Sequence, residues 1–156
     1  MPIAPLLQSY LNDRNINYEV LSHRPTHTSM ETAEAAHIPG DRLVKAVVLC
    51  REGGFTLAIL PASCHVRLDA VKELIPGPIT LASEEEIAGI FPDCEVGAIP
   101  PIGDAYGVDV IVDESLDKED DIYFEAGDHE RLIHLSAAQF HEAYATSPRA
   151  TFAEHI

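Results

Sequence analysis

The sequence predicts a single domain of the α+β class, built on a mixed, largely antiparallel, barrel-like sheet that is flanked by helices. Three observations lead to this prediction. The chain has 156 residues, a length that fits one domain with its own core. No repeat, low-complexity stretch or linker divides it. The predicted helices and strands alternate without a regular βαβ rhythm, and several connections are short hairpins. We therefore treat residues 1–156 as one unit.

The expected helices are marked by apolar spacing and by capping boxes, in which Ser or Thr is followed three residues later by Glu or Gln. Apolar residues recur at helical spacing in the first helix, and capping-box pairs occur at Thr28 with Glu31, Ser83 with Glu86 and Ser136 with Gln139. The expected helices cover 5–15, 32–37, 69–75, the residues from Ser83 to about Ile90, and those from Ser136 to about Tyr144.

The expected strands are short aliphatic and β-branched runs bounded by turn residues. They cover 18–21, 43–50, 55–61, 108–112, 122–125 and 131–135. The clearest pair is 43–50 with 55–61, because the segment between them, Arg51-Glu52-Gly53-Gly54, is typical of a tight turn. We expect these two strands to form a hairpin.

The charge of the chain limits its partners. The formal net charge is −16, which disfavours DNA binding and any broad electrostatic grip on nucleic acid, since such binding depends on Lys and Arg. The charge is also uneven, because residues 1–72 are balanced and residues 73–156 carry the whole excess. A surface that faces phosphates must therefore come from the first half.

Compartment and cofactor signals point to a cytoplasmic protein without a metal or other cofactor. Three cysteines without CxxC spacing suit a reducing compartment, and neither a signal peptide nor a run of about 20 apolar residues predicts a membrane partner. Pro25 lies between His23 and His27 and prevents the helix that would align them, and Cys64-His65 has no partner pair. No phosphate-binding or serine-hydrolase motif occurs.

Lys45 is the first candidate site residue, because it interrupts the apolar run Leu43-Val44-Lys45-Ala46-Val47-Val48-Leu49. On strand alternation it shares a face with Leu43 and Val47. Its ammonium would then reach a cleft where it meets an anion or a carbonyl. An edge-strand lysine that blocks aggregation explains the pattern equally well.

The segment Gly97-Ala98-Ile99-Pro100-Pro101-Ile102-Gly103 is the second candidate. Its prolines fix the backbone, and its glycines allow turns and a close approach by a ligand. Its N–H groups could hold a carbonyl or a developing oxyanion. A Pro-rich surface turn has the same composition and is more common.

A predicted turn at 125–130 is the third candidate. Within it, His129 could move a proton or donate a hydrogen bond. A solvated loop histidine beside two acidic residues is the alternative.

Taken together, these features resemble the YbaK family, which includes the editing domain inserted in bacterial prolyl-tRNA synthetases and its free-standing relatives. The resemblance spans nearly the whole chain and rests on motifs in a fixed order. They are His-Arg-Pro at 23–25, Thr-Ala-Glu-Ala-Ala at 32–36, the run around Lys45, Gly-x-x-x-Pro-x-Gly at 97–103, and Ala-Gly at 126–127.

The resemblance implies hydrolysis of the ester in a mischarged aminoacyl-tRNA, of the alanyl- or cysteinyl-tRNA(Pro) type. It implies that Lys45 is the main functional residue, that Gly97, Ala98, Pro101 and Gly103 shape the aminoacyl pocket, and that no covalent nucleophile is used. Gly127 and His129 are further candidates for substrate binding by the same alignment. The implied partners are the tRNA acceptor end and an aminoacyl-tRNA synthetase.

A second function fits the same fold. A non-catalytic binding or regulatory module could recognise an aminoacyl-like ligand or a protein partner, and the strong negative charge favours this alternative. Turnover of charged tRNA distinguishes the two.

Overall fold

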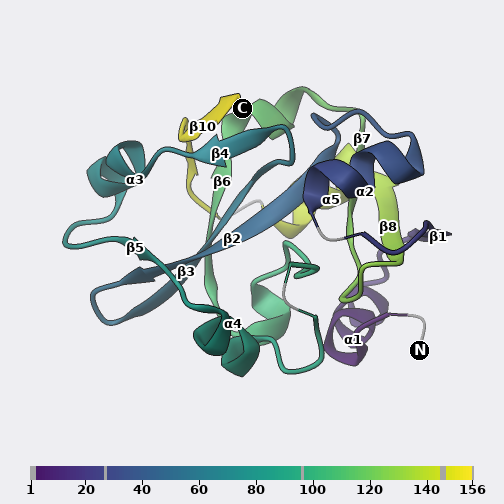
Figure 1. Cartoon of the computed structure of the whole chain (residues 1–156), viewed down its shortest axis with the longest axis horizontal. Helices are drawn as coiled ribbons and strands as arrows, with labels where there is room; N and C mark the ends of the chain where they lie inside the picture. The colour runs from purple at the N-terminus through teal and green to yellow at the C-terminus, as the bar shows by residue number, and fades with distance from the viewer. Residues whose placement is uncertain (1–2, 27, 96, 145–146, 156) are drawn as a thin grey trace.

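A computed structural model describes residues 3–26, 28–95, 97–144 and 147–155 of the chain (Figure 1). The helices are α1 (Pro5–Asp13), α2 (Ser29–Ala36), α3 (Leu68–Leu74), α4 (Glu84–Ile90) and α5 (Ala137–Ala143), with 3₁₀ turns η1 (Asp104–Tyr106) and η2 (Glu114–Lys118). The strands are β1 (Glu19–Ser22), β2 (Leu43–Arg51), β3 (Gly54–Pro61), β4 (Cys64–Val66), β5 (Thr80–Leu81), β6 (Asp109–Asp113), β7 (Asp121–Glu125), β8 (Arg131–Ser136), β9 (Arg149–Ala150) and β10 (Ala153–His155).

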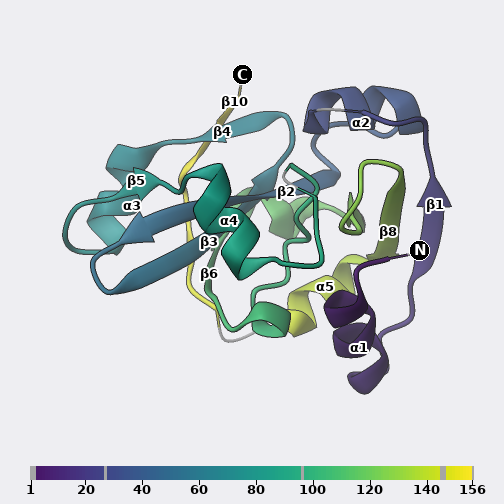
Figure 2. The same ribbon diagram turned by 60° about the horizontal axis from the view of Figure 1, so that its bottom comes forward.

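The main sheet has the strand order β1-β8-β7-β2-β3-β6-β9, and β5 also pairs with β2. The pairs β2/β7, β3/β6 and β6/β9 are parallel, whereas the others in this sheet are antiparallel. A small second sheet joins β10 to β4. Figure 2 shows α2 beside the β1/β8 end of the molecule and the β2/β3 hairpin extending toward the other end. The predicted α+β fold with a mixed, largely antiparallel sheet and flanking helices is confirmed.

Strand β2 is buried on both of its faces. Val44 and Val48 belong to the main core, together with side chains of α1 and α5. Leu49 on the opposite face packs into a second core that includes Val71 of α3 and Phe152. A long apolar run is what a strand between two cores requires, and this explains the continuous pattern of 43–49.

Most element boundaries agree with the predictions to within one or two residues, with one correction. The helix predicted at 32–37 begins at Ser29, because Thr28 is its N-cap and accepts a hydrogen bond from the N–H of Glu31. The cap was correctly paired, but the helix start was placed three residues too late. His37 ends the helix in the left-handed conformation with φ of 57°. No helix in the described part of the chain is long and apolar enough to cross a membrane.

Candidate functional site

The main sheet splits beside the middle of β2. On one side β2 pairs with β3 along nearly its whole length, from Val44 to Arg51. On the other side it pairs with β7 only at Leu43 and Val44, and with β5 only at Leu49 and Cys50. The strand edge between these two short ladders therefore lacks a neighbouring strand among the described residues.

Backbone parity shows which groups face this gap. The carbonyl of Leu43 accepts from Ala62 on the β3 side, whereas that of Val48 accepts from Ala82 on the opposite side. The N–H and C=O of one strand residue point the same way, and this direction alternates along the strand. Both backbone groups of Ala46 therefore point into the gap. They offer a ligand one donor and one acceptor at a fixed position.

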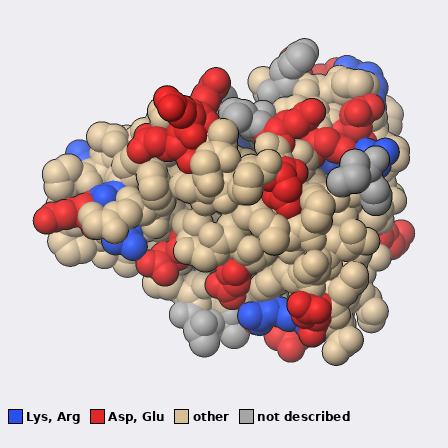
Figure 3. Space-filling model, turned by 90° about the horizontal axis from the view of Figure 1, so that it is seen from below, with Lys and Arg blue, Asp and Glu red and all other residues tan. Residues whose placement is uncertain are grey.

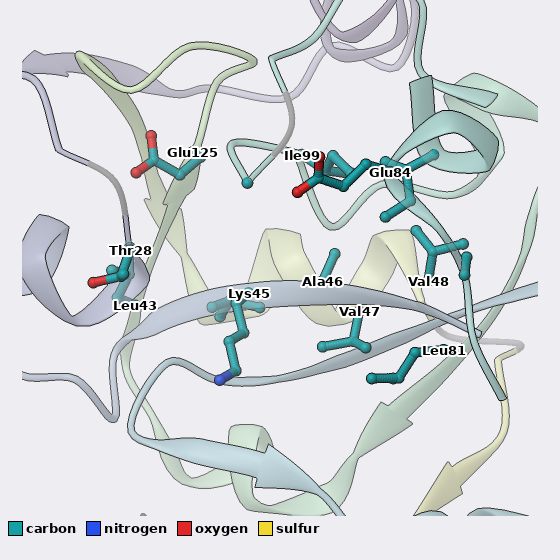
Figure 4. A pocket seen from close by; sticks show the side chains of 14 residues that line it. Thr28, Leu43, Lys45, Ala46, Val47, Val48, Leu81, Glu84, Ile99 and Glu125 are labelled. Atoms are coloured by element: carbon teal, nitrogen blue, oxygen red, sulfur yellow. The ribbon is translucent and has the colours of Figure 1, made fainter. Parts of the chain in front are cut away.

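A pocket of about 390 Å³ occupies this gap (Figure 4). Its lining residues come from β2, β5, α4 and the end of β7, and from three connecting segments. They are Thr28, Leu43, Val44, Lys45, Ala46, Val47, Val48, Leu81, Ala82, Glu84, Ile87, Gly97, Ile99 and Glu125. The walls are mainly aliphatic, and the ionisable groups among them are Lys45, Glu84 and Glu125. A larger hollow elsewhere, of about 610 Å³, is lined by carboxylates such as Asp113 and Glu114 and suits an anionic ligand poorly.

Lys45 lies on β2 at the edge of this pocket and is half-buried. Its side chain leaves the strand on the side opposite to Ala46 and points away from Glu125 (Figure 4). Burial lowers the pKa of Lys45, and the nearby Cys64 partly opposes this effect. No carboxylate of the described residues lies within ion-pair distance of its ammonium. Lys45 is therefore a partly desolvated cation that a ligand anion or carbonyl can approach.

The two predicted loops are joined to each other by backbone hydrogen bonds. The N–H of Gly127 donates to the carbonyl of Ala98 at 3.1 Å, and the N–H of Glu95 donates to the carbonyl of Gly127 at 2.8 Å. Gly97 and Ile99 face the pocket from this joined structure. Gly97 has a φ of 91°, a conformation in which a residue with a side chain would be strained.

Other residues predicted for this loop do not line the pocket. Ala98 and Pro101 are buried behind it. Gly103 is packed so tightly that a Cβ atom would overlap the side chain of Val110 and the carbonyl of Val108. A Cβ on Gly127 would lie 2.8 Å from that of Ala4. These residues support the loop from behind, and their part in substrate binding stays a prediction.

His129 is also outside the pocket lining, in the half-buried bend that follows β7. The residue of this region that does reach the pocket is Glu125, at the end of β7. Glu125 lies within the candidate turn predicted at 125–130, but the sequence assigns site roles there only to Gly127 and His129. The burial of Glu125 comes from segments distant in the sequence, which leave no local signal.

Glu125 is 5% exposed and lies in a buried polar cluster. Its Oε1 accepts a hydrogen bond from the Thr32 hydroxyl at 2.8 Å. The hydroxyl oxygens of Thr32 and Thr26 lie 2.5 Å apart. Oε2 of Glu125 faces Nε2 of His23 at 3.7 Å. Burial is the main cause that raises the pKa of Glu125 to about 8, and Asp128 and Glu95 contribute, whereas the bond from Thr32 opposes the shift.

Lys45 is the basic residue in the described lining of the pocket, and three arginines of the first half are paired with acidic residues elsewhere. Arg42, Arg51 and Arg67 each lie within ion-pair distance of a carboxylate, on Glu119, Asp109 and Asp69 respectively. On the face drawn in Figure 3, acidic side chains predominate and the few basic ones lie near acidic neighbours. This face therefore offers little positive surface for the body of a nucleic acid.

Metal ligands do not gather in the part of the chain that the structure describes. No group of three or more His, Cys, Asp or Glu side chains there could hold a metal ion. His23 belongs to the cluster around Glu125, and His27 lies outside the described residues. The described lining of the pocket also contains no Ser or Cys, and the Thr28 hydroxyl is engaged as a helix cap. The chemistry available is therefore that of a cation, open backbone groups and a buried carboxylate.

Solved structures with the same fold include proteins of different descriptions. A proposed trans-editing enzyme for prolyl-tRNA synthetase matches with a TM-score of 0.86 and 23% identity, covering 99% of this chain and 98% of that one. The hypothetical protein APE2540 matches with a TM-score of 0.84 and 22% identity, covering 96% and 99% of the two chains. A proposed signal transduction protein from Marinobacter aquaeolei VT8 matches at 0.74 and 19%, covering 95% of this chain but 30% of that one.

At these identities the structural matches establish the fold alone. Among curated proteins, none matches the chain significantly. The sequence itself matches the aminoacyl-tRNA editing domain over residues 23–143, which is most of the chain and includes β2, the pocket and both joined loops. The protein therefore belongs to the aminoacyl-tRNA editing domain family.

Proposed function

We propose that the protein is a deacylase that hydrolyses the ester bond of mischarged aminoacyl-tRNA in trans. One observation carries the proposal: the pocket has a partly desolvated lysine at its edge and lies along a strand edge without a neighbouring strand, inside the region that matches the editing family. An aminoacyl ester has a carbonyl that becomes negatively charged during hydrolysis, and it is attached to a phosphate chain. A fixed cation and a backbone N–H suit both features.

The proposed reaction needs no covalent intermediate. Lys45 binds the terminal phosphate or the ester carbonyl and stabilises the charge that develops there, while the backbone of Ala46 fixes the aminoacyl group. Water, or a hydroxyl of the terminal ribose, then attacks the carbonyl. The absence of Ser and Cys from the described pocket lining supports this route.

We further propose that the removed amino acid is small and uncharged, as alanine or cysteine on proline tRNA would be. The aliphatic walls at Val48, Ile87 and Ile99 favour an apolar side chain, and the pocket must also admit part of the ribose. The likeness to a proposed trans-editing enzyme for prolyl-tRNA synthetase agrees with this choice. Such an activity would operate in the cytoplasm, where tRNA is charged.

The weak basic surface supports a proposal about partners. The pocket can hold the acceptor end, but Arg42, Arg51 and Arg67 are neutralised by carboxylates. We propose that the protein reads the acceptor end, and that an aminoacyl-tRNA synthetase supplies the remaining affinity for tRNA.

The test is a panel of charged tRNAs that includes alanyl-, cysteinyl-, seryl- and prolyl-tRNA(Pro), incubated with the wild type and with Lys45→Ala. We expect release of alanine or cysteine by the wild type only, with retention of cognate proline. Equal inactivity of both proteins on every charged tRNA would refute the deacylase. Binding of an aminoacyl-adenosine analogue without turnover would instead identify a non-catalytic module.

A further inference from the structure

The polar cluster beneath the pocket contains two buried atoms that face each other without a hydrogen bond. Nε2 of His23 and Oε2 of Glu125 are both fully buried, neither has a hydrogen-bond partner among the residues that the structure describes, and they lie 3.7 Å apart. Unpaired buried polar atoms are uncommon, and each requires a physical explanation. These two lie directly behind a pocket wall, because Glu125 itself lines the pocket.

Hydrogen-bond accounting fixes how many protons the two residues hold. Nδ1 of His23 lies 2.7 Å from the carbonyl of Arg24, and a carbonyl can only accept, so Nδ1 must carry a proton. In a neutral imidazole Nε2 is then an acceptor, and a carboxylate Oε2 is also an acceptor. Two acceptors cannot stabilise each other in a buried site. One additional proton, on either atom, resolves the conflict.

The other groups around Glu125 favour retention of that proton. Thr32 on α2 donates to Oε1, but Asp128 in the bend after β7 and Glu95 in the loop after α4 add negative charge. Burial acts in the same direction and raises the pKa of Glu125 to about 8. Lys45 points away and does not neutralise the carboxylate (Figure 4).

We propose that His23 and Glu125 share one proton, and that the pair, on releasing it, becomes the subsite for the positively charged α-amino group of the aminoacyl substrate. This inference rests on the proposed function, since it assigns a part of the substrate to a part of the same pocket. The carbonyl of Ala46, which points into the gap, is a further acceptor in this pocket. The amino group and the phosphate chain then bind toward opposite signs of charge, Glu125 and Lys45, which fixes the orientation of the ester between them.

The proton balance follows from this arrangement. The one-proton pair is electrically neutral, whereas the pair without the proton carries one negative charge. Binding of an ammonium group to the latter restores neutrality, so at pH 7 binding is expected to release up to about one proton to solvent. A ligand that lacks the amino group has no reason to expel the proton.

The test uses two stable probes, 3′-alanylamino-3′-deoxyadenosine and its 3′-propionylamino counterpart, which lacks only the amino group. Calorimetry in two buffers of different ionisation enthalpy measures affinity and protons released. We expect Glu125→Gln to lower the affinity for the alanyl probe by about tenfold to a hundredfold, which is the range for a hydrogen bond to a charged group. The same variant should abolish proton release on binding. The propionyl probe should bind both proteins equally.

Two further variants separate this role from a structural one. Glu85→Gln removes an exposed carboxylate of α4 that does not line the pocket, and it should leave the affinity for both probes unchanged. His23→Gln retains Glu125 and should keep the preference for the alanyl probe, but with an altered pH dependence of its affinity. Gln at position 125 can still accept from Thr32, and thermal unfolding of each variant verifies that it is folded.

The outcomes are distinguishable from those that test the deacylase itself. If charged tRNA is hydrolysed but Glu125→Gln leaves KM and proton release unchanged, the subsite is wrong and the deacylase stands. If no charged tRNA is hydrolysed but the alanyl probe binds with release of a proton, the subsite stands and the deacylase fails. Two results would overturn the proposal that His23 and Glu125 share a proton and bind the α-amino group. One is a wild type that does not prefer the alanyl probe, and the other is an unaltered pH dependence of probe affinity in His23→Gln.

Discussion

Two regions of the pocket are built in opposite ways. The β2 segment at 43–51 is a regular strand with no neighbouring strand beside Ala46 among the described residues, and the side chain that we propose to be functional, Lys45, has no ionic partner there. The joined loops at 97–103 and 126–130 are irregular, held by backbone bonds around Gly127, and closely packed. A side chain on an open strand can be changed without loss of the fold. In the loops, shape and stability depend on the same residues.

The largest effect is expected at Lys45, where activity and stability should separate. Lys45→Met keeps an unbranched side chain of similar length and removes a partly desolvated charge. The free energy of unfolding should therefore stay the same or rise slightly. Deacylation should fall by about a hundredfold or more, as for the loss of one preorganised donor. Denaturant unfolding and single-turnover hydrolysis measure the two quantities.

Lys72→Met, an exposed position on α3, is the matched control and should change neither quantity. A marked loss of stability in Lys45→Met would contradict the comparison, because the lysine would then be a structural element of β2.

At Glu125 we expect the opposite relation, because the buried carboxyl group that we propose for substrate binding lowers the stability of the fold. Its pKa is raised from 4.5 to about 8, so between these values the folded state holds a proton that the unfolded state has released. The free energy of unfolding of the wild type therefore falls as the pH rises from 5 toward 9. Glu125→Gln lacks this dependence and should gain up to a few kcal/mol relative to the wild type, at about 1.4 kcal/mol per pKa unit.

Denaturant midpoints at pH 5, 7 and 9 test this expectation. Glu84→Gln, an exposed carboxylate of the same pocket, is the control and should change stability little at any pH. Parallel pH profiles for the wild type and Glu125→Gln would show that the carboxyl is not buried as described.

Gly103 tests the dependence of the loops on close packing. A Cβ there would meet Val110 and the backbone of Val108, and the backbone cannot move aside cheaply. We expect Gly103→Ala to lower the free energy of unfolding by about 1–3 kcal/mol, as overpacked sites do. Gly89→Ala, at a position in α4 with open space around it, should be neutral or stabilising because Ala favours helices.

If Gly103→Ala keeps wild-type stability but loses activity, Gly103 contacts the substrate directly and the structural role given to it here is wrong. Thermal unfolding and deacylation of the two alanine variants decide this.

The same contrast explains how much could be predicted from the sequence. The helices, the long strands and Lys45 were accessible because their signals are local: capping pairs, apolar runs and one charge within such a run. The family motifs indicated the region of the loops. The sequence pattern did not separate Gly97, which faces the pocket, from Gly103, which packs behind the loop, because both are simply glycines in a Pro-rich segment.

Glu125 and the short strands could not be predicted for a different reason. Glu125 is buried by His23 and Thr32, residues about a hundred positions away in the chain, and no local pattern records such contacts. The strands β5 and β10 are only two and three residues long, too short for alternation to be visible. The split in the sheet beside Ala46 likewise depends on where β7 and β5 end, which is a property of the assembled fold.

The smallest effect is expected from salt, and it concerns the whole surface around the two regions. Lys45 is the basic side chain among the described pocket residues, and Arg42, Arg51 and Arg67 each lie within ion-pair distance of an acidic partner. The logarithm of kcat/KM for free charged tRNA should therefore fall with the logarithm of salt concentration with a slope of about −1 to −2, since each single-strand phosphate contributes roughly −0.7. A slope of −5 or steeper would mean that an extended basic surface holds the tRNA, and that reading of the acceptor end alone is wrong. A shallow slope that steepens when prolyl-tRNA synthetase is added would locate the missing phosphate contacts on the partner.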